Sequence, residues 1–148
     1  MSLFSSLEIS SSGLSAQRTR LKVISSNIAN INTTRTPGGG PYRRREVIFG
    51  ALPSQKSFME ELKGQEENTG MRQVKVLGIV EDSRPPKMKY DPSHPDANEE
   101  GYVALPNVDI VEEMTNMMVT KRSYEANIAA INATKNMISR SLEIGGRG

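Results

Sequence analysis

Apolar residues recur at helical spacing in the first part of the chain. Four of them lie seven residues apart: Leu7, Leu14, Leu21 and Ile28. Three more occupy the companion positions of an a/d-like seam: Leu3, Ile24 and Ile31. This pattern over residues 3–31 predicts an amphipathic helix. Ser10 to Gly13 are poor helix formers, and a glycine costs up to about 1 kcal/mol relative to alanine, so we expect this helix to need a packing partner.

The helical period returns near the C-terminus, over about residues 109–143. One stripe carries eight apolar side chains: Ile110, Met114, Met117, Tyr124, Ile128, Ile131, Ile138 and Leu142. Two lysines interrupt the stripe, although their long stems can cover apolar surface. Asn107 or Asp109 can cap the first turn, where Glu112 and Glu113 suit the positive end of the helix dipole. At 1.5 Å per residue this helix would be about 50 Å long, and the N-terminal helix about 40 Å.

The middle of the chain follows a different pattern. The proline- and glycine-rich segment 36–41 ends any helix. Strands are predicted around 42–49, at 74–80 and, as a short third strand, at 88–90. The sequence therefore predicts an α+β fold in which long N- and C-terminal α-helices pack as a coiled-coil-like stalk around a small irregular β domain. We divide it into an N-terminal helix (1–33), a loop (34–41), a β-rich middle (42–105) with a charged insertion at about 54–68, and a C-terminal helix (106–148).

Composition narrows the function classes. The 19 basic and 17 acidic residues give a net charge of +2, so the whole chain has no strong attraction to nucleic acid or anionic lipid. The absence of cysteine excludes disulfides, thiolate catalysis and cysteine-ligated metals. The first residues lack the basic and apolar regions of a cleaved signal peptide, and no stretch is apolar enough to span a membrane. We therefore expect a protein that is cytosolic or exported without a cleaved signal.

Candidate catalytic chemistry is sparse. His94, the single histidine, lies between Asp91 and Asp96 in a proline-rich turn, and we interpret it as a surface turn more readily than as a metal site. The glycine run at 38–40 lacks the lysine and hydroxyl ending of a phosphate-binding loop. The basic run 43–45 has no aromatic platform beside it, which favours a solvated strand face or an intersubunit ion pair over nucleic-acid binding. We predict no catalytic residue, no metal and no cofactor.

Two motifs carry a family resemblance. Residues 25–34, Ser-Ser-Asn-Ile-Ala-Asn-Ile-Asn-Thr-Thr, resemble the N-terminal signature of flagellar axial proteins, the rod and hook group. Residues 105–114 and 122–127 resemble the C-terminal motif of the same group. The matching positions are Ser26, Asn27, Ala29, Asn30, Thr33, Pro106, Asn107, Tyr124, Glu125, Ala126 and Asn127. Segments between them are similar to the proximal-rod members, so the chain resembles the flagellar basal-body rod protein family, from which the charged stretch 54–68 departs by its length.

The resemblance implies a structural subunit of the basal-body rod that assembles helically and transmits motor torque. It implies export from the cytoplasm through the flagellar type III apparatus and a final position in the rod, which crosses the periplasm. The implied partners are copies of the chain, other rod subunits, the junction and ring proteins of the basal body, and the export gate. Phe58 and Leu62 fit a loose export-gate motif, and a solvent-facing helical turn is the alternative interpretation.

The packing hypothesis follows from the two stripes. The row of Leu7, Leu14, Leu21 and Ile28 is expected to pack on the C-terminal stripe, with the remaining apolar surface buried by neighbouring subunits. Two alternatives remain open at this stage. One is a soluble coiled-coil adaptor whose methionine-rich helix docks partners, and the other is an enzyme with a site around His94.

Overall fold

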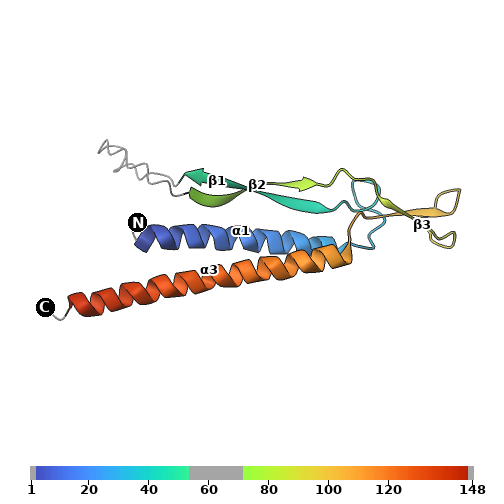
Figure 1. Cartoon of the computed structure of the whole chain (residues 1–148). Coiled ribbons are helices and arrows are strands. Elements are labelled where there is room, and N and C mark those ends of the chain that lie inside the picture. The colour runs from blue at the N-terminus through green and yellow to red at the C-terminus, as the bar shows by residue number, and fades with distance from the viewer. Residues whose placement is uncertain (1–2, 54–71, 147–148) are drawn as a thin grey trace.

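The computed structural model describes residues 3–53 and 72–146, and it has an elongated shape (Figure 1). Two long helices run antiparallel, a two-stranded ribbon lies along the face of the first helix opposite the second, and a smaller hairpin projects beyond one end (Figure 1). Both chain ends lie at the other end of the molecule (Figure 1). The predicted α+β class is confirmed, while coiled-coil packing remains a prediction.

Helix α1 spans Leu3–Ala29, close to the predicted bounds. It lies between helix α3, which spans Ile110–Gly145, and the β ribbon. The segment Ser10–Gly13 is helical despite its low propensity, because α1 is covered on two sides by its own chain. The packing partner that the sequence requires is thus present within the chain itself.

Helix α3 is capped by Asp109, whose carboxylate accepts hydrogen bonds from the backbone N–H groups of Val111 and Glu112. This settles the choice between Asn107 and Asp109, since Asn107 is buried elsewhere. The C-terminal end of α3 extends past the start of α1 (Figure 1). No stretch of the described helices is long and apolar enough to cross a membrane.

The ribbon consists of β1 (Arg45–Pro53) and β2 (Arg72–Glu81), paired antiparallel from Arg45 opposite Glu81. A bulge between Ile48 and Phe49 shifts the register. Strand β1 starts later than predicted and extends to Pro53, beyond the predicted strand around 42–49. Residues 54–71 lie outside the described part of the chain.

The projecting hairpin consists of β3 (Lys87–Tyr90) and β4 (Tyr102–Leu105). Strand β4 was not predicted, because four residues between a glycine and a proline give too short a pattern to recognise. The middle of the chain therefore forms two separate two-stranded sheets. Val103 of β4 is buried, at 1% exposure, so the hairpin is anchored on one face.

Candidate functional site

The side chain of Asn27, 1% exposed near the end of α1, makes four hydrogen bonds. Its Nδ2 donates to the carbonyl oxygen of Arg45 at 2.9 Å and to Oε2 of Glu113 at 3.0 Å. Its Oδ1 accepts from the N–H of Arg45 and from the hydroxyl of Tyr42, both at 2.9 Å. A carboxamide offers two donors and two acceptor sites, so every one is used. Asn27 therefore joins α1, the start of β1 and α3 at one point.

Glu113 on α3 is fully buried, at 0% exposure, and is paired with Arg44. The Nε of Arg44 donates to Oε1 of Glu113 at 2.7 Å, a short charge-assisted hydrogen bond. The other guanidinium nitrogens lie 3.2 Å from Glu112 and 3.6 Å from Glu46. A buried carboxylate is tolerated only when it is paired and hydrogen-bonded, and both oxygens of Glu113 have partners.

We call Asn27, Tyr42, Arg44, Asn107 and Glu113 the polar cluster. Asn107 completes it, because its Oδ1 accepts from the N–H of Arg44 at 3.0 Å. The five residues come from the N-terminal helix, the loop before β1 and the start of the C-terminal segment. The cluster therefore closes only when three distant parts of the chain have come together.

The electrostatics of the cluster favour the charged form of Arg44. Burial opposes the charge, but the hydrogen bond and the negative charge of Glu113 outweigh it, so the pKa of Arg44 is raised above its usual value. Beside the cluster lies a cavity of about 20 Å³, lined in part by Arg20, Val23 and Asn116. That volume holds about one water molecule and leaves no room for a substrate. The arrangement is suited to holding segments together.

Away from the cluster, α1 and α3 approach closely at Gly13. A Cβ at Gly13 would lie 3.2 Å from both Nδ2 and Oδ1 of Asn127, tighter than an ordinary contact. The glycine that weakens the helix by propensity is thus the residue that admits a side chain from α3. Asn127 also donates to the carbonyl of Ser123 at 3.0 Å.

The inward face of α3 has two parallel rows of residues. One row is polar, with members seven residues apart: Glu113, Thr120, Asn127 and Thr134. The hydroxyls of Thr120 and Thr134, which are 1% and 4% exposed, donate to the carbonyls of Asn116 and Ala130 four residues earlier. Buried polar groups on this face therefore have partners, as a stable interior requires.

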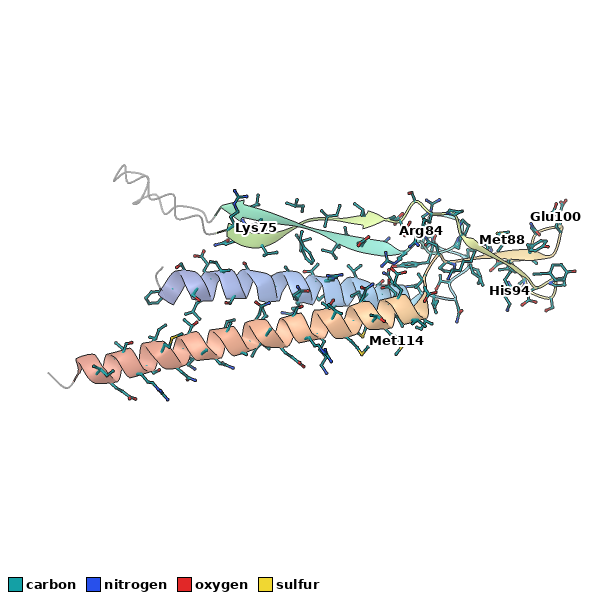
Figure 2. The ribbon with its side chains drawn as sticks, in the orientation of Figure 1. Lys75, Arg84, Met88, His94, Glu100 and Met114 are labelled. Atoms are coloured by element: carbon teal, nitrogen blue, oxygen red, sulfur yellow. The ribbon has the colours of Figure 1, made fainter. Side chains whose placement is uncertain are left out.

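The second inward row is apolar and half-buried: Met117, Tyr124, Ile131 and Ile138. The structure thus brings half of the predicted C-terminal stripe toward α1. The remaining members are exposed: Ile110, Met114, Ile128 and Leu142. Met114 lies on the side of α3 away from α1 (Figure 2).

On α1 the predicted row is half-buried along its length: Leu7, Leu14, Leu21 and Ile28. The fully buried positions lie beside that row: Ala16, Val23, Ile24 and Asn27. Of the predicted seam, Ile24 alone is fully buried among the residues whose burial is described. The seam is displaced because α1 packs on two partners, α3 and the ribbon.

Other motif residues shape the end of α1. Asn30 donates through Nδ2 to the carbonyl of Ser26 at 2.9 Å, and Thr33 donates through its hydroxyl to Oδ1 of Asn30 at 3.1 Å. The carbonyl of Thr33 accepts from the N–H of Tyr42 at 3.0 Å, which directs the chain toward the polar cluster. Ala29 and Ala126 are exposed, Pro106 is buried, and Glu125 pairs with Lys121 on the surface at 3.8 Å.

The basic run 43–45 requires a correction. Arg44 is buried and forms an ion pair with Glu113 of its own chain. It is therefore neither on a solvated face nor available to another subunit. Arg45 pairs with Glu81 at 3.0 Å, while Arg43 is exposed.

The Nδ1 atom of His94 accepts a hydrogen bond from the backbone N–H of Asp96 at 3.1 Å, as in a local turn. In the described part of the chain, no group of three potential ligands converges to hold a metal.

Sequence reasoning missed Arg44, Glu113 and Tyr42. Glu113 lies seven residues before Thr120 and four before Met117, so it shares the inward face of α3. A carboxylate at this inward-facing position of a helix needs a buried cation as its partner, and the run 43–45 supplies one. The position of Glu113 on the inward face of α3 was therefore the sequence signal that could have indicated this pair. Phe58 and Leu62 lie outside the described residues.

Comparison with known proteins places both motifs in one group. The model for "Flagella basal body rod protein" matches residues 7–35, and the model for "Flagellar basal body rod FlgEFG protein C-terminal" matches residues 99–144. These two matches contain Asn27, Asn107 and Glu113. Each family segment thus contributes to the polar cluster.

Curated relatives match over nearly the whole chain. The flagellar basal-body rod protein FlgC of Bacillus subtilis is 47% identical over 152 residues, covering 98% of this chain and 99% of the relative. That of Borreliella burgdorferi is 46% identical over 149 residues, covering 97% and 98%. That of Salmonella typhimurium is 40% identical over 147 residues, covering 98% and 99%.

Proposed function

Because the chain belongs to the flagellar basal-body rod protein FlgC family, and is therefore a structural subunit of the basal-body rod, we propose that its outward helix faces join neighbouring subunits and transmit torque. It assembles with other rod and basal-body components. Its role is mechanical, without catalysis or a cofactor.

One observation carries the mechanical proposal: α3 exposes a large apolar surface that the described part of its own chain leaves uncovered. The exposed large apolar side chains of α3 are Ile110, Val111, Met114, Met118, Val119, Ile128, Met137, Leu142 and Ile144. Apolar surface of this extent, running along one helix, is typical of a contact with other proteins. Heterologous contacts that do not close into a ring generate a helical tube, which is the form a rod requires.

The polar cluster supplies the stiffness of the subunit. A buried polar network with every group satisfied allows one arrangement of its segments, since a shift in register would leave charges unpaired. We propose that the cluster fixes α1 against α3, so that the outward faces meet neighbours in one geometry. Torque then passes through closely packed helix contacts.

Delivery to the rod is part of the proposal. The chain would leave the cytoplasm unfolded through the type III apparatus, whose gate is a partner, and would reach a rod that crosses the periplasm, next to the junction and ring proteins. A chain without disulfides, whose α1 is weak until covered, suits export before folding. Phe58 and Leu62 remain candidates for the export element.

Two substitutions on adjacent faces of α3 test the mechanical proposal. Ile128→Asp places a charge on the outward face, where the wild-type side chain is 38% exposed. The folded chain should persist, while its amount in purified basal bodies and the motility of the cell should fall. Ile131→Asp places the charge on the inward face and should unfold the chain. Normal basal bodies and motility with Ile128→Asp would reject the outward-face role.

A further inference from the structure

A short corner, residues 82–86, joins the ribbon to the projecting hairpin by connecting β2 to β3. Figure 2 shows Arg84 at this corner, between the two sheets. Residues 85 and 86 are both proline, and each proline fixes its own φ and restricts the residue before it. The corner therefore has less backbone freedom than an ordinary linker of the same length.

Hydrogen bonds close the corner on itself and on the ribbon. The carboxylate of Asp82 accepts from the backbone N–H and from Nε of Arg84, at 2.9 Å and 2.7 Å. The N–H of Asp82 donates to the carbonyl oxygen of Arg44 at 2.8 Å, just before β1 begins. The corner is thus bound to the residue that precedes β1, as well as being continuous with β2.

Asn107 ties the same corner to the segment that leads into α3. Its Oδ1 accepts from the N–H of Arg44 at 3.0 Å, and its Nδ2 donates to the carbonyl oxygen of Arg84 at 3.4 Å. The side chain of Asn107 is buried, so breaking these bonds would leave its polar atoms without partners. Asn107 therefore links the polar cluster to the part of the chain that enters the hairpin.

Lys87, the first residue of β3, reaches the start of α3. Its Nζ donates to the carbonyl oxygen of Val108 at 3.0 Å and lies 3.9 Å from Oδ2 of Asp109, the residue that caps α3. The other strand of the hairpin, β4, is connected to α3 through residues 106–109 of the chain. Both strands of the hairpin are therefore attached to the start of α3, one covalently and one through the Lys87 side chain.

We propose that the corner 82–86, together with Asn107 and Lys87, is a rigid joint that fixes the direction of the hairpin relative to the helix pair. A hairpin attached through one strand can pivot about that strand, whereas attachment through both strands opposes such a hinge motion. The joint makes the hairpin and the helix pair one mechanical body. It is a property of the single subunit, so it goes beyond the proposed function and is tested without basal bodies.

Distances between spin labels measure the joint in the purified chain, which has no cysteine of its own. Glu100→Cys with Met118→Cys reports the hairpin against α3, and Lys22→Cys with Met118→Cys is the reference pair for α1 against α3. All three positions are exposed. In double electron–electron resonance, the hairpin-to-helix distance distribution should be no wider than about twice that of the reference pair. A wider distribution would mean that the hairpin pivots, and the proposal would be rejected.

Two lysine variants test the part played by Lys87. Lys87→Met keeps the apolar stem but removes the donors, and Lys89→Met makes the same change at a lysine that pairs with Asp91, next to β3, at 3.7 Å. Both lysines are exposed, so both variants should fold. We expect Lys87→Met to widen the hairpin-to-helix distribution at least about twofold and Lys89→Met to leave it unchanged. Equal widths in the two variants would overturn the proposal.

The corner is tested by a second matched pair. Asp82→Ala removes both hydrogen bonds to Arg84 and should also widen the hairpin-to-helix distribution. Asp91→Ala removes a hydrogen bond from Ser93 within the hairpin loop and should not. In each variant the reference pair should keep its wild-type width, which shows that the helix pair stays folded while the joint loosens. An unchanged hairpin-to-helix width with Asp82→Ala would contradict the joint.

Discussion

Asn27 and Glu113, separated by 86 positions in the sequence, share a buried hydrogen bond of 3.0 Å between α1 and α3. Glu113 is held on its other oxygen by Arg44 at 2.7 Å. The bond links the two segments that carry the family motifs, and it leaves neither oxygen of the carboxylate unpaired.

Replacing Asn27 by alanine should be strongly destabilising. The change removes four hydrogen bonds and leaves buried groups of Tyr42, Arg45 and Glu113 without that partner. The expected loss is about 2–4 kcal/mol of unfolding free energy, measured by urea unfolding of the purified chain. Asn32→Ala, at an exposed position just beyond α1, is the control and should leave the midpoint unchanged. Equal stability of the two variants would show that the cluster is dispensable.

Neighbouring glutamates provide a matched pair on α3. Glu113→Gln leaves the buried Arg44 without its closest carboxylate and should cost about 3–5 kcal/mol. Glu112→Gln removes an exposed partner 3.2 Å from the same guanidinium and should cost less than about 1 kcal/mol. Thermal unfolding followed by circular dichroism compares them. A larger effect at position 112 would contradict the assignment of Glu113 as the main partner.

The close approach at Gly13 predicts a dependence on side-chain size. Gly13→Leu cannot fit beside Asn127 unless the helices separate, so it should destabilise the chain by about 1–3 kcal/mol as overpacking does. Ser11→Leu, at an exposed position on the same helix, is the control. Urea unfolding measures both variants. If Gly13→Leu were neutral or stabilising, the contribution of helix propensity would exceed that of packing.

The cap of α3 should make stability depend on pH. Hydrogen bonds from the N–H groups of Glu112 and Val111 lower the pKa of Asp109 below its usual value of 3.8. A group whose pKa is lower when folded contributes stability above its unfolded pKa and loses it as pH falls through the folded pKa. Asp109→Asn should therefore unfold at a lower temperature than wild type at neutral pH, and the difference should shrink below about pH 4.

Glu143→Gln is the control for this pH profile, because Glu143 is exposed at the other end of α3. Its profile should follow that of the wild type. If Asp109→Asn and wild type differed by the same amount at every pH, the charge of Asp109 would have no part in capping.

Local pattern was sufficient for the two helices and the main strands. The recurrence of Leu7, Leu14, Leu21 and Ile28 depends only on residues within a few turns of each other, so it indicated α1 without knowledge of its partner. The same holds for the alternating residues of β2. Strand β4 escaped prediction because a four-residue strand contains too little periodicity.

The sequence by itself determined the long terminal helices, the α+β class and, through its paired motifs, the resemblance to flagellar rod proteins. The tertiary structure alone decided which helix faces are buried, that Glu113 points inward to Arg44, and that Gly13 admits Asn127. The physical reason is the distance along the sequence between the residues that determine each feature. Periodicity is a property of neighbouring residues, whereas a buried ion pair or a close helix approach depends on segments that become neighbours only when the chain has folded.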